Sequence, residues 1–97
     1  MKKQKEEYLR IILNVDEQLM DTAQHGGEHA EANIRMLLEK GADANKQDKN
    51  GYTAMMITAQ HGGEHGLSMM RVLLENGADT NTQNKYSGLT ALTIAAR

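Results

Sequence analysis

The sequence predicts an all-α fold built from repeated helix–turn–helix units. The first observation is that the eight residues 22–29 (TAQHGGEH) recur unchanged 36 positions later, at 58–65. The second is that the block 37–45 (LLEKGADAN) recurs at 73–81 with two substitutions and the same spacing. The third is that apolar residues in both copies follow helical spacing and stop at a glycine. A repeat of this length is typical of solenoid proteins.

The second copy shows most clearly how one unit is organised. Thr53 is a suitable N-cap residue, and a short helix is expected over 54–60. The Gly-Gly pair at 62–63 should end that helix, since glycine disfavours helix interiors. A second helix is expected over about 67–76, where apolar residues form a broad face. Gly77 follows it at the position where a left-handed residue ends many helices.

The preceding copy has the same organisation. Asp16 is expected to cap a helix over 17–24, and a second helix is expected over 30–40. Gly41 should end this second helix in the left-handed conformation. The first copy therefore predicts one complete unit ahead of the second.

Polar segments at 45–51 and 81–88 connect the units and have the Gly/Asn-rich chemistry of turns or hairpins. A partial third copy follows, in which Gly88 to Leu92 corresponds to 51–55 at a spacing of 37. We therefore expect one inserted residue in the second connecting segment, at Tyr86-Ser87.

Composition limits both the core and the function. The 97 residues include no Phe, Trp, Pro or Cys but seven Met, so we expect Met55-Met56 and Met69-Met70 to fill core volume. A net charge of −2 argues against a nucleic-acid-binding module. The absence of long apolar runs argues against a membrane span and a signal peptide. Without Cys there is no disulfide framework, and a reducing cytoplasmic location is expected.

The repeated block resembles the ankyrin repeat family. The resemblance rests on the string Leu-Leu-x-x-Gly-Ala-Asp-x-Asn at 37–45 and 73–81 and on Asp48-x-x-Gly51-x-Thr53. It covers about 80% of the chain, from Asp16 onward, and implies a solenoid with short β-hairpin fingers and no cofactor. Two features depart from the family: Thr53-Ala54-Met55-Met56 replaces Thr-Pro-Leu-His, and the unit has 36 residues instead of about 33.

These units suggest a division of the chain. Residues 1–15 are expected to form an N-terminal capping helix, because 3–13 has an amphipathic pattern and repeat stacks need capped ends. The repeats are expected at about 16–47 and 48–83, with a partial copy at 84–97. Apolar residues of that partial copy lack the second helix of their unit. Either the chain is a fragment of a longer repeat protein or a second copy covers them by self-association.

Two histidine motifs match a known zinc-binding pattern. His25-Gly-Gly-Glu28-His29 and its copy from His61 formally match the H-x-x-E-H pattern of some zinc proteases. That chemistry needs both His on one helix face, and Gly-Gly in the middle disfavours a helix there. Catalysis is not expected, and a polar turn is favoured over metal binding by the four His. The resemblance also implies a minor possibility, hydroxylation of Asn45 or Asn81.

The resemblance therefore implies a non-catalytic protein-interaction module that binds another protein, with no nucleic acid, membrane or metal. An alternative is an accessory or targeting fragment of a larger ankyrin-containing enzyme or effector; an engineered scaffold is disfavoured, because a consensus design would keep Pro and His in Thr-Pro-Leu-His. Binding would use the tips of the connecting segments and the concave face of the first helices. The candidate partner-binding residues are Gln24, His25, Gln47, Lys49, Asn50, Tyr52, Gln60, His61, Gln83, Lys85, Tyr86 and Leu89.

Overall fold

The computed structural model describes residues 14–61 and 63–97, and this part of the chain is helical with no β-strand. The predicted all-α repeat fold is confirmed, whereas residues 1–13 of the capping helix expected over 1–15 lie outside the described residues. The helices are α2 (Val15–His25), α3 (Ala30–Glu39), α4 (Ala54–His61), the 3-10 helix η1 (Gly63–His65), α5 (Gly66–Glu75) and α6 (Ala91–Ala95).

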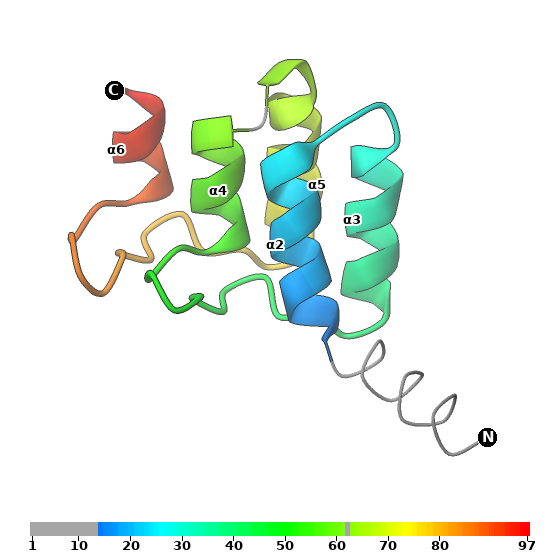
Figure 1. Ribbon diagram of the computed structural model, residues 1–97, viewed down its shortest axis with the longest axis horizontal. Helices are drawn as coiled ribbons and strands as arrows, with labels where there is room; N and C mark the ends of the chain where they lie inside the picture. The colour runs from blue at the N-terminus through cyan, green and yellow to red at the C-terminus, as the bar shows by residue number, and fades with distance from the viewer. Residues whose placement is uncertain (1–13, 62) are drawn as a thin grey trace.

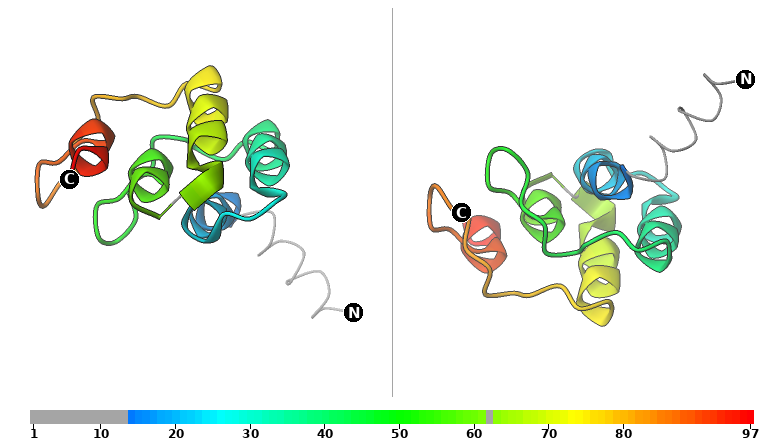
Figure 2. Two further views of the ribbon diagram at one scale, coloured as in Figure 1. Left: turned by 90° about the horizontal axis from the view of Figure 1, so that it is seen from above. Right: turned by 90° about the horizontal axis from the view of Figure 1, so that it is seen from below.

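The helices form two rows. The first helices of the units, α2, α4 and α6, lie side by side, and α3 and α5 form a second row behind them (Figures 1 and 2). Each second helix also packs against the first helix of its own unit. The two complete units are therefore α2–α3 and α4–α5, and α6 stands at the end of the first row as the start of a third unit.

A thin aliphatic core lies between the two rows. The prediction that methionines fill it is confirmed: Met55, Met56 and Met69 are at most 2% exposed, and Met70 is half-buried against the core. The largest fully buried side chains are Leu19, Ile34, Met56, Met69, Val72 and Leu73. Both units contribute to this layer, so the core forms without Phe or Trp.

Both predicted glycine stops are confirmed, and each forms a Schellman motif. Gly41 has a φ of 100°, and its N–H donates to the carbonyl of Leu38 at 3.0 Å. The next N–H, that of Ala42, donates to the carbonyl of Leu37 at 3.0 Å. The same two bonds recur around Gly77, which has a φ of 91°. Carbonyls that a helix end leaves unpaired are satisfied in this way.

Helix starts follow the predictions less uniformly. Thr53 caps α4 as expected, because its hydroxyl accepts the N–H of Met56 at 3.3 Å. The cap predicted for Asp16 is wrong: α2 begins at Val15, so Asp16 lies inside its first turn. The Asp16 carboxylate instead accepts the N–H of Asp43 at 2.6 Å. Its role is to join α2 to the first connecting loop.

The expected break near the Gly-Gly pair is also observed in the second unit. Helix α4 ends at His61, and a single 3-10 turn from Gly63 to His65 leads directly into α5. Helix α5 therefore begins at Gly66, one residue earlier than predicted, since the 3-10 turn already reverses the chain.

The predicted β-hairpin fingers are not confirmed, and the connecting segments form tight loops. In the first loop the N–H of Asp48 donates to the carbonyl of Tyr52 at 2.9 Å, and the N–H of Gly51 donates back to Asp48 at 2.9 Å. In the second loop the corresponding turn runs from Asn84 to Gly88 and is one residue longer. The predicted insertion is thus accommodated within the turn. Each loop has too few backbone hydrogen bonds between its two arms to form a β-hairpin.

Side chains within the loops support this backbone. The Asp48 carboxylate accepts the N–H groups of Asn50 and Tyr52 at 2.8 and 2.9 Å. The amide oxygen of Asn84 accepts the N–H groups of Tyr86 and Ser87 in the second loop. These Asx-type bonds hold the turns.

Two amide side chains of the first loop clamp the second loop. Asn45 donates to the carbonyl of Gly77 at 3.0 Å and accepts the N–H of Asp79 at 2.7 Å. Gln47 donates to the carbonyl of Gln83 at 3.1 Å and accepts the N–H of Lys85 at 3.0 Å. Each amide bonds to a carbonyl and to an N–H two residues further along. These four bonds tie one unit to the next through the backbone.

This clamp predicts unequal effects for two equivalent asparagines. Asn45→Ala should lower the free energy of unfolding by about 1 kcal/mol, because two partly solvated hydrogen bonds between units are lost. Asn81→Ala should leave it almost unchanged, because the Asn81 side chain bonds to no residue in the described part of the chain. Urea denaturation in dilute solution measures both. Equal losses for the two variants would contradict the clamp.

Gly51 allows the two loops to approach closely. Its φ is 84°, and a Cβ placed there would lie 2.5 Å from Oδ1 of Asn84. Asn84 cannot easily move aside: it is only 4% exposed, and its amide nitrogen donates to the carbonyl of Asn50 at 3.1 Å. Gly51 therefore satisfies a steric requirement as well as a conformational one.

Gly88 offers a matched control for this position. Its φ is 75°, but a Cβ there would meet nothing within 4 Å. Alanine should cost about 1–2 kcal/mol at either glycine for the left-handed backbone. Gly51→Ala should cost at least about 1 kcal/mol more, because it also disturbs the hydrogen bonds of buried Asn84. Thermal unfolding of the two variants measures the difference, and equal melting temperatures would contradict the close approach.

Candidate functional site

A continuous groove runs along the side of the molecule where the loops face the first helices; we call it the inner groove. It consists of three neighbouring depressions of about 500, 230 and 350 Å³. Adjacent depressions share residues: Gln24, Asp48 and Ile57 line the first two, and Tyr52 and Gln60 line the last two. The groove therefore extends over all three units.

Aligning the units explains which side chains form the groove. The equivalent residues Asp21, Ile57 and Ile94 all line it, at one position of the first helix in each unit. A second set of equivalent residues lies three positions further on. Its members, which also line the groove, are Gln24, Gln60 and Arg97. Stacked helices thus present the same helical position to the groove.

The end of the groove formed by α2 is charged. Asp16 pairs with Lys46 across the groove at 3.5 Å, and its other oxygen holds the first loop. Asp21 faces His25 at 3.2 Å on the same helix. Glu17 makes no ion pair with any residue in 14–61 or 63–97, so this end carries an acidic excess. Exposed pairs of this kind add little stability.

The middle of the groove is polar and contains the side chain of Tyr52. This side chain is half-buried, packs against the core and lines the second and third depressions. Its backbone is fixed from both directions, because its N–H donates to Asp48 and its carbonyl accepts the N–H of the same residue. Packing against the core and two backbone bonds therefore hold Tyr52 in place at the groove.

The structure brings most, but not all, of the predicted partner-binding residues to this groove. The ones that line it are Gln24, Gln47, Lys49, Asn50, Tyr52, Gln60, His61 and Leu89. The ones that do not are His25, Gln83, Lys85 and Tyr86. Residue type alone did not separate these two sets, since both contain polar, basic and histidine side chains.

The predicted residues outside the groove have different surroundings. Tyr86 is 70% exposed at the tip of the second loop, with the ammonium of Lys85 5.3 Å from its ring centre. Both Tyr52 and Tyr86 are candidate partner-binding residues, but of the two only Tyr52 packs against the core. At a spacing of 37 the position of Tyr52 is occupied by Leu89 in the third unit, whereas Tyr86 lies at the tip of the loop before it. Gln47 is a groove residue whose amide already serves the interloop clamp.

Sequence reasoning missed eleven of the groove residues, among them Asp16, Glu17, Met20, Asp21 and Ile57. Asp16 was assigned to a cap, and Ile57 reads as core from its hydrophobicity. The repeat alignment could have found them, because Asp16 is equivalent to Tyr52 and Asp21 to Ile57. The prediction started from residue types that favour binding and did not follow equivalent positions through the units.

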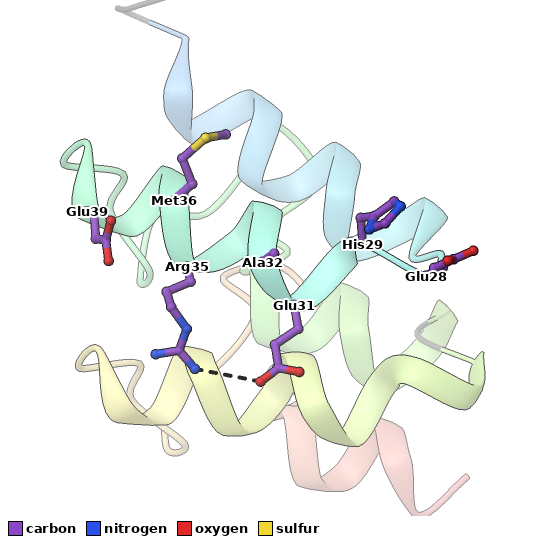
Figure 3. A pocket seen from close by; sticks show the side chains of 7 residues that line it. All are labelled: Glu28, His29, Glu31, Ala32, Arg35, Met36 and Glu39. Atoms are coloured by element: carbon purple, nitrogen blue, oxygen red, sulfur yellow. Dashed lines mark ion pairs between the residues drawn. The ribbon is translucent and has the colours of Figure 1, made fainter.

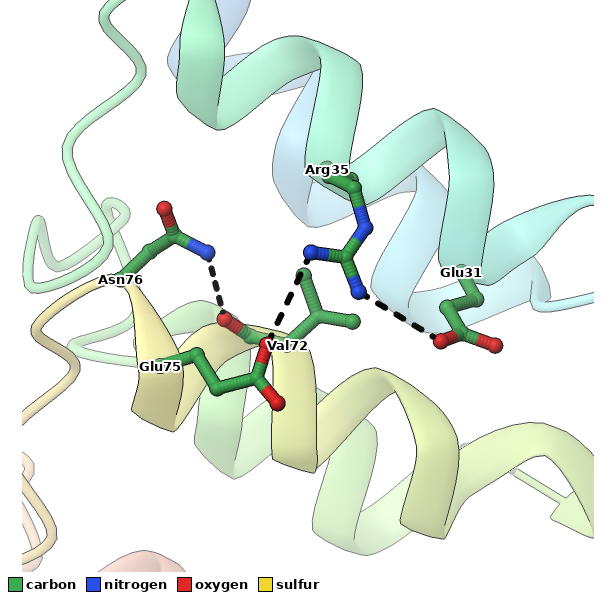
Figure 4. A network of polar contacts seen from close by, with 5 residues as sticks. All are labelled: Glu31, Arg35, Val72, Glu75 and Asn76. Atoms are coloured by element: carbon green, nitrogen blue, oxygen red, sulfur yellow. Dashed lines mark hydrogen bonds and ion pairs between the residues drawn. The ribbon is translucent and has the colours of Figure 1, made fainter.

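A separate depression of about 360 Å³ lies on the outer side of α3 (Figure 3). It is lined entirely by residues from Glu28 to Glu39, on this helix and the turn before it. Nearby, Arg35 pairs with Glu31 on α3 and with Glu75 on α5, each at 3.6 Å, and so links the second row of helices (Figure 4). A depression between side chains of one helix offers less contact area than the inner groove.

The histidine motifs do not form a metal site in the described residues. His25 ends α2, His29 lies in the turn before α3, and no three His, Asp or Glu side chains gather around one point in residues 14–61 and 63–97. His65 lies 3.6 Å from Glu64 in the 3-10 turn of the second unit. The turn predicted for these motifs is observed in both copies.

Comparison with known proteins now places the chain in a family. The family model for three copies of the ankyrin repeat matches residues 19–97, so this chain belongs to the ankyrin repeat family. Ankyrin repeats generally mediate protein–protein interactions and are typically non-catalytic. No curated protein sequence matches the chain significantly. Within the described residues, no helix has the length and hydropathy needed to cross a bilayer.

Proposed function

We propose that this protein is a non-catalytic interaction module that binds a partner protein in the inner groove. The observation that carries the proposal is the continuity of the groove over α2, α4 and α6, with three depressions that share their lining residues. A continuous groove suits an extended segment of a partner better than a small molecule, because no single depression encloses a ligand.

The side chains of the groove indicate how such a segment would be held. Tyr52 supplies a rigid aromatic surface at the centre, and aromatic side chains fixed in this way often dominate binding energy. Gln24, Asn50 and Gln60 around it can donate and accept hydrogen bonds. The acidic excess at the α2 end would favour a partner with basic side chains there. The loop tip that carries Tyr86 would contact the partner outside the groove.

A peptide selected for binding tests this proposal. Peptides from a random phage-displayed library should bind the immobilised chain, and Gln60→Arg should weaken binding at least about tenfold. Gln60 is exposed at the centre of the groove, so a larger charged side chain blocks the groove without entering the core. Titration calorimetry with the selected peptide measures the change.

Asn33→Arg is the matched control, because Asn33 is an exposed amide residue on α3 that does not line the groove. This variant should bind the peptide as the unmodified chain does. Tyr52→Ala should also lose binding, with circular dichroism showing whether its helices remain. Selected peptides that tolerate Gln60→Arg but fail to bind Asn33→Arg would place binding on the outer side and refute the proposal.

A further inference from the structure

The inner groove changes its chemical character from one end to the other. At one of its repeated positions the residues of the three units are, in order, Asp16, Tyr52 and Leu89. At a second repeated position the residues are Asp21, Ile57 and Ile94. Both series begin with a carboxylate and continue with aromatic or aliphatic side chains. The groove therefore separates negative charge, at α2, from apolar surface, towards α6.

The α2 end of the groove offers carboxylates to a partner. Glu17 and Asp21 are four residues apart, so they project from the same side of α2, and both are exposed. Asp16 is already paired with Lys46 of the first loop. Four carboxylates and two lysines line this depression, which leaves an excess of two negative charges. A long cationic side chain fits this end, because Met20 beside the carboxylates can contact its aliphatic part.

The α6 end of the groove has the opposite character. Tyr52, Leu89 and Ile94 line the third depression, and each is only half-buried, so part of each side chain is open to a ligand. The charged residue that lines this depression is Arg97, whose guanidinium would repel a second cation. An apolar side chain fits this end, because the contact withdraws apolar surface from water on both sides.

The distance between the two ends sets the spacing of the two side chains. Helices α2, α4 and α6 lie side by side (Figure 1), and packed helices are about 8–10 Å apart. Two such steps separate α2 from α6 by about 16–20 Å. An extended chain advances about 3.3 Å per residue, so it covers this distance in about five or six residues.

We propose that the inner groove selects an extended segment with a lysine or arginine at the α2 end and an apolar residue at the α6 end, about five or six positions apart. This inference rests on the proposed function and names the class of segment that the groove takes. Glu17 and Asp21 contact the cation, and Leu89 and Ile94 contact the apolar side chain. The hydrogen bonds that hold the loops come from other residues than Glu17 and Asp21, so both carboxylates can be changed without loosening the groove.

The sequences of the peptides selected from the random library test this specificity. Peptides that lose binding to Gln60→Arg should share a lysine or arginine and, five or six positions away, an apolar residue. Replacing that basic residue by alanine should weaken binding at least about threefold. The loss should shrink at high salt, because salt screens the charges. Peptides that depend on Gln60 but share no basic residue would overturn this inference and leave the proposed function standing. Peptides that bind regardless of Gln60→Arg would overturn both.

Two double variants of equal charge change locate the cation. Glu17→Lys with Asp21→Lys should weaken the selected peptide at least about tenfold, because like charges then face each other. The matched control is Glu28→Lys with Glu39→Lys, at exposed positions outside the inner groove, and it should bind almost normally. Circular dichroism checks that both variants keep their helices. A peptide whose basic residue is replaced by glutamate should regain binding to the first variant alone. Equal losses for the two double variants would overturn the inference.

Discussion

Each unit of this protein is completed by the unit beside it, and the rest of the structure depends on that contact. A helix pair of this size cannot bury its apolar face alone, and stacking supplies the missing cover. The contact has an apolar part, in which α4 packs between α2 and α6, and a polar part, in which Asn45 and Gln47 bond to the next loop. Leucine and methionine side chains suffice for the core because the units share one hydrophobic core and none needs a separate one.

The polar part of this contact also defines the loops. Amide side chains hold the backbone of the next loop, and Asp48 and Asn84 hold their own turns, so neither loop needs strand pairing. Loops fixed in this way form one wall of the inner groove, and the first helices form the other. Stability and binding surface thus come from the same repeated bonds, and a change that loosens a loop also moves the wall of the groove.

The two ends of the stack are chemically different. At the first loop, the Asp16 carboxylate on α2 accepts the N–H of Asp43, whereas at the second loop Asn45 accepts the equivalent N–H of Asp79. Asp16 also forms an ion pair with Lys46 in the first loop. At the last loop, the equivalent side chains of Asn81 and Gln83 bond to no residue in the part of the chain that the structure describes.

The sequence by itself determined the repeat, the helix order, the glycine stops at Gly41 and Gly77 and the methionine core, because these follow from local spacing and backbone conformation. It also supplied eight of the nineteen residues that line the groove. The tertiary structure alone decided the role of Asp16, the packing of Tyr52 rather than Tyr86, and the loops in place of hairpins. The position of Asp16 and the bonds between the two loops depend on contacts between residues 27 to 38 positions apart, and local propensity carries no information about such contacts.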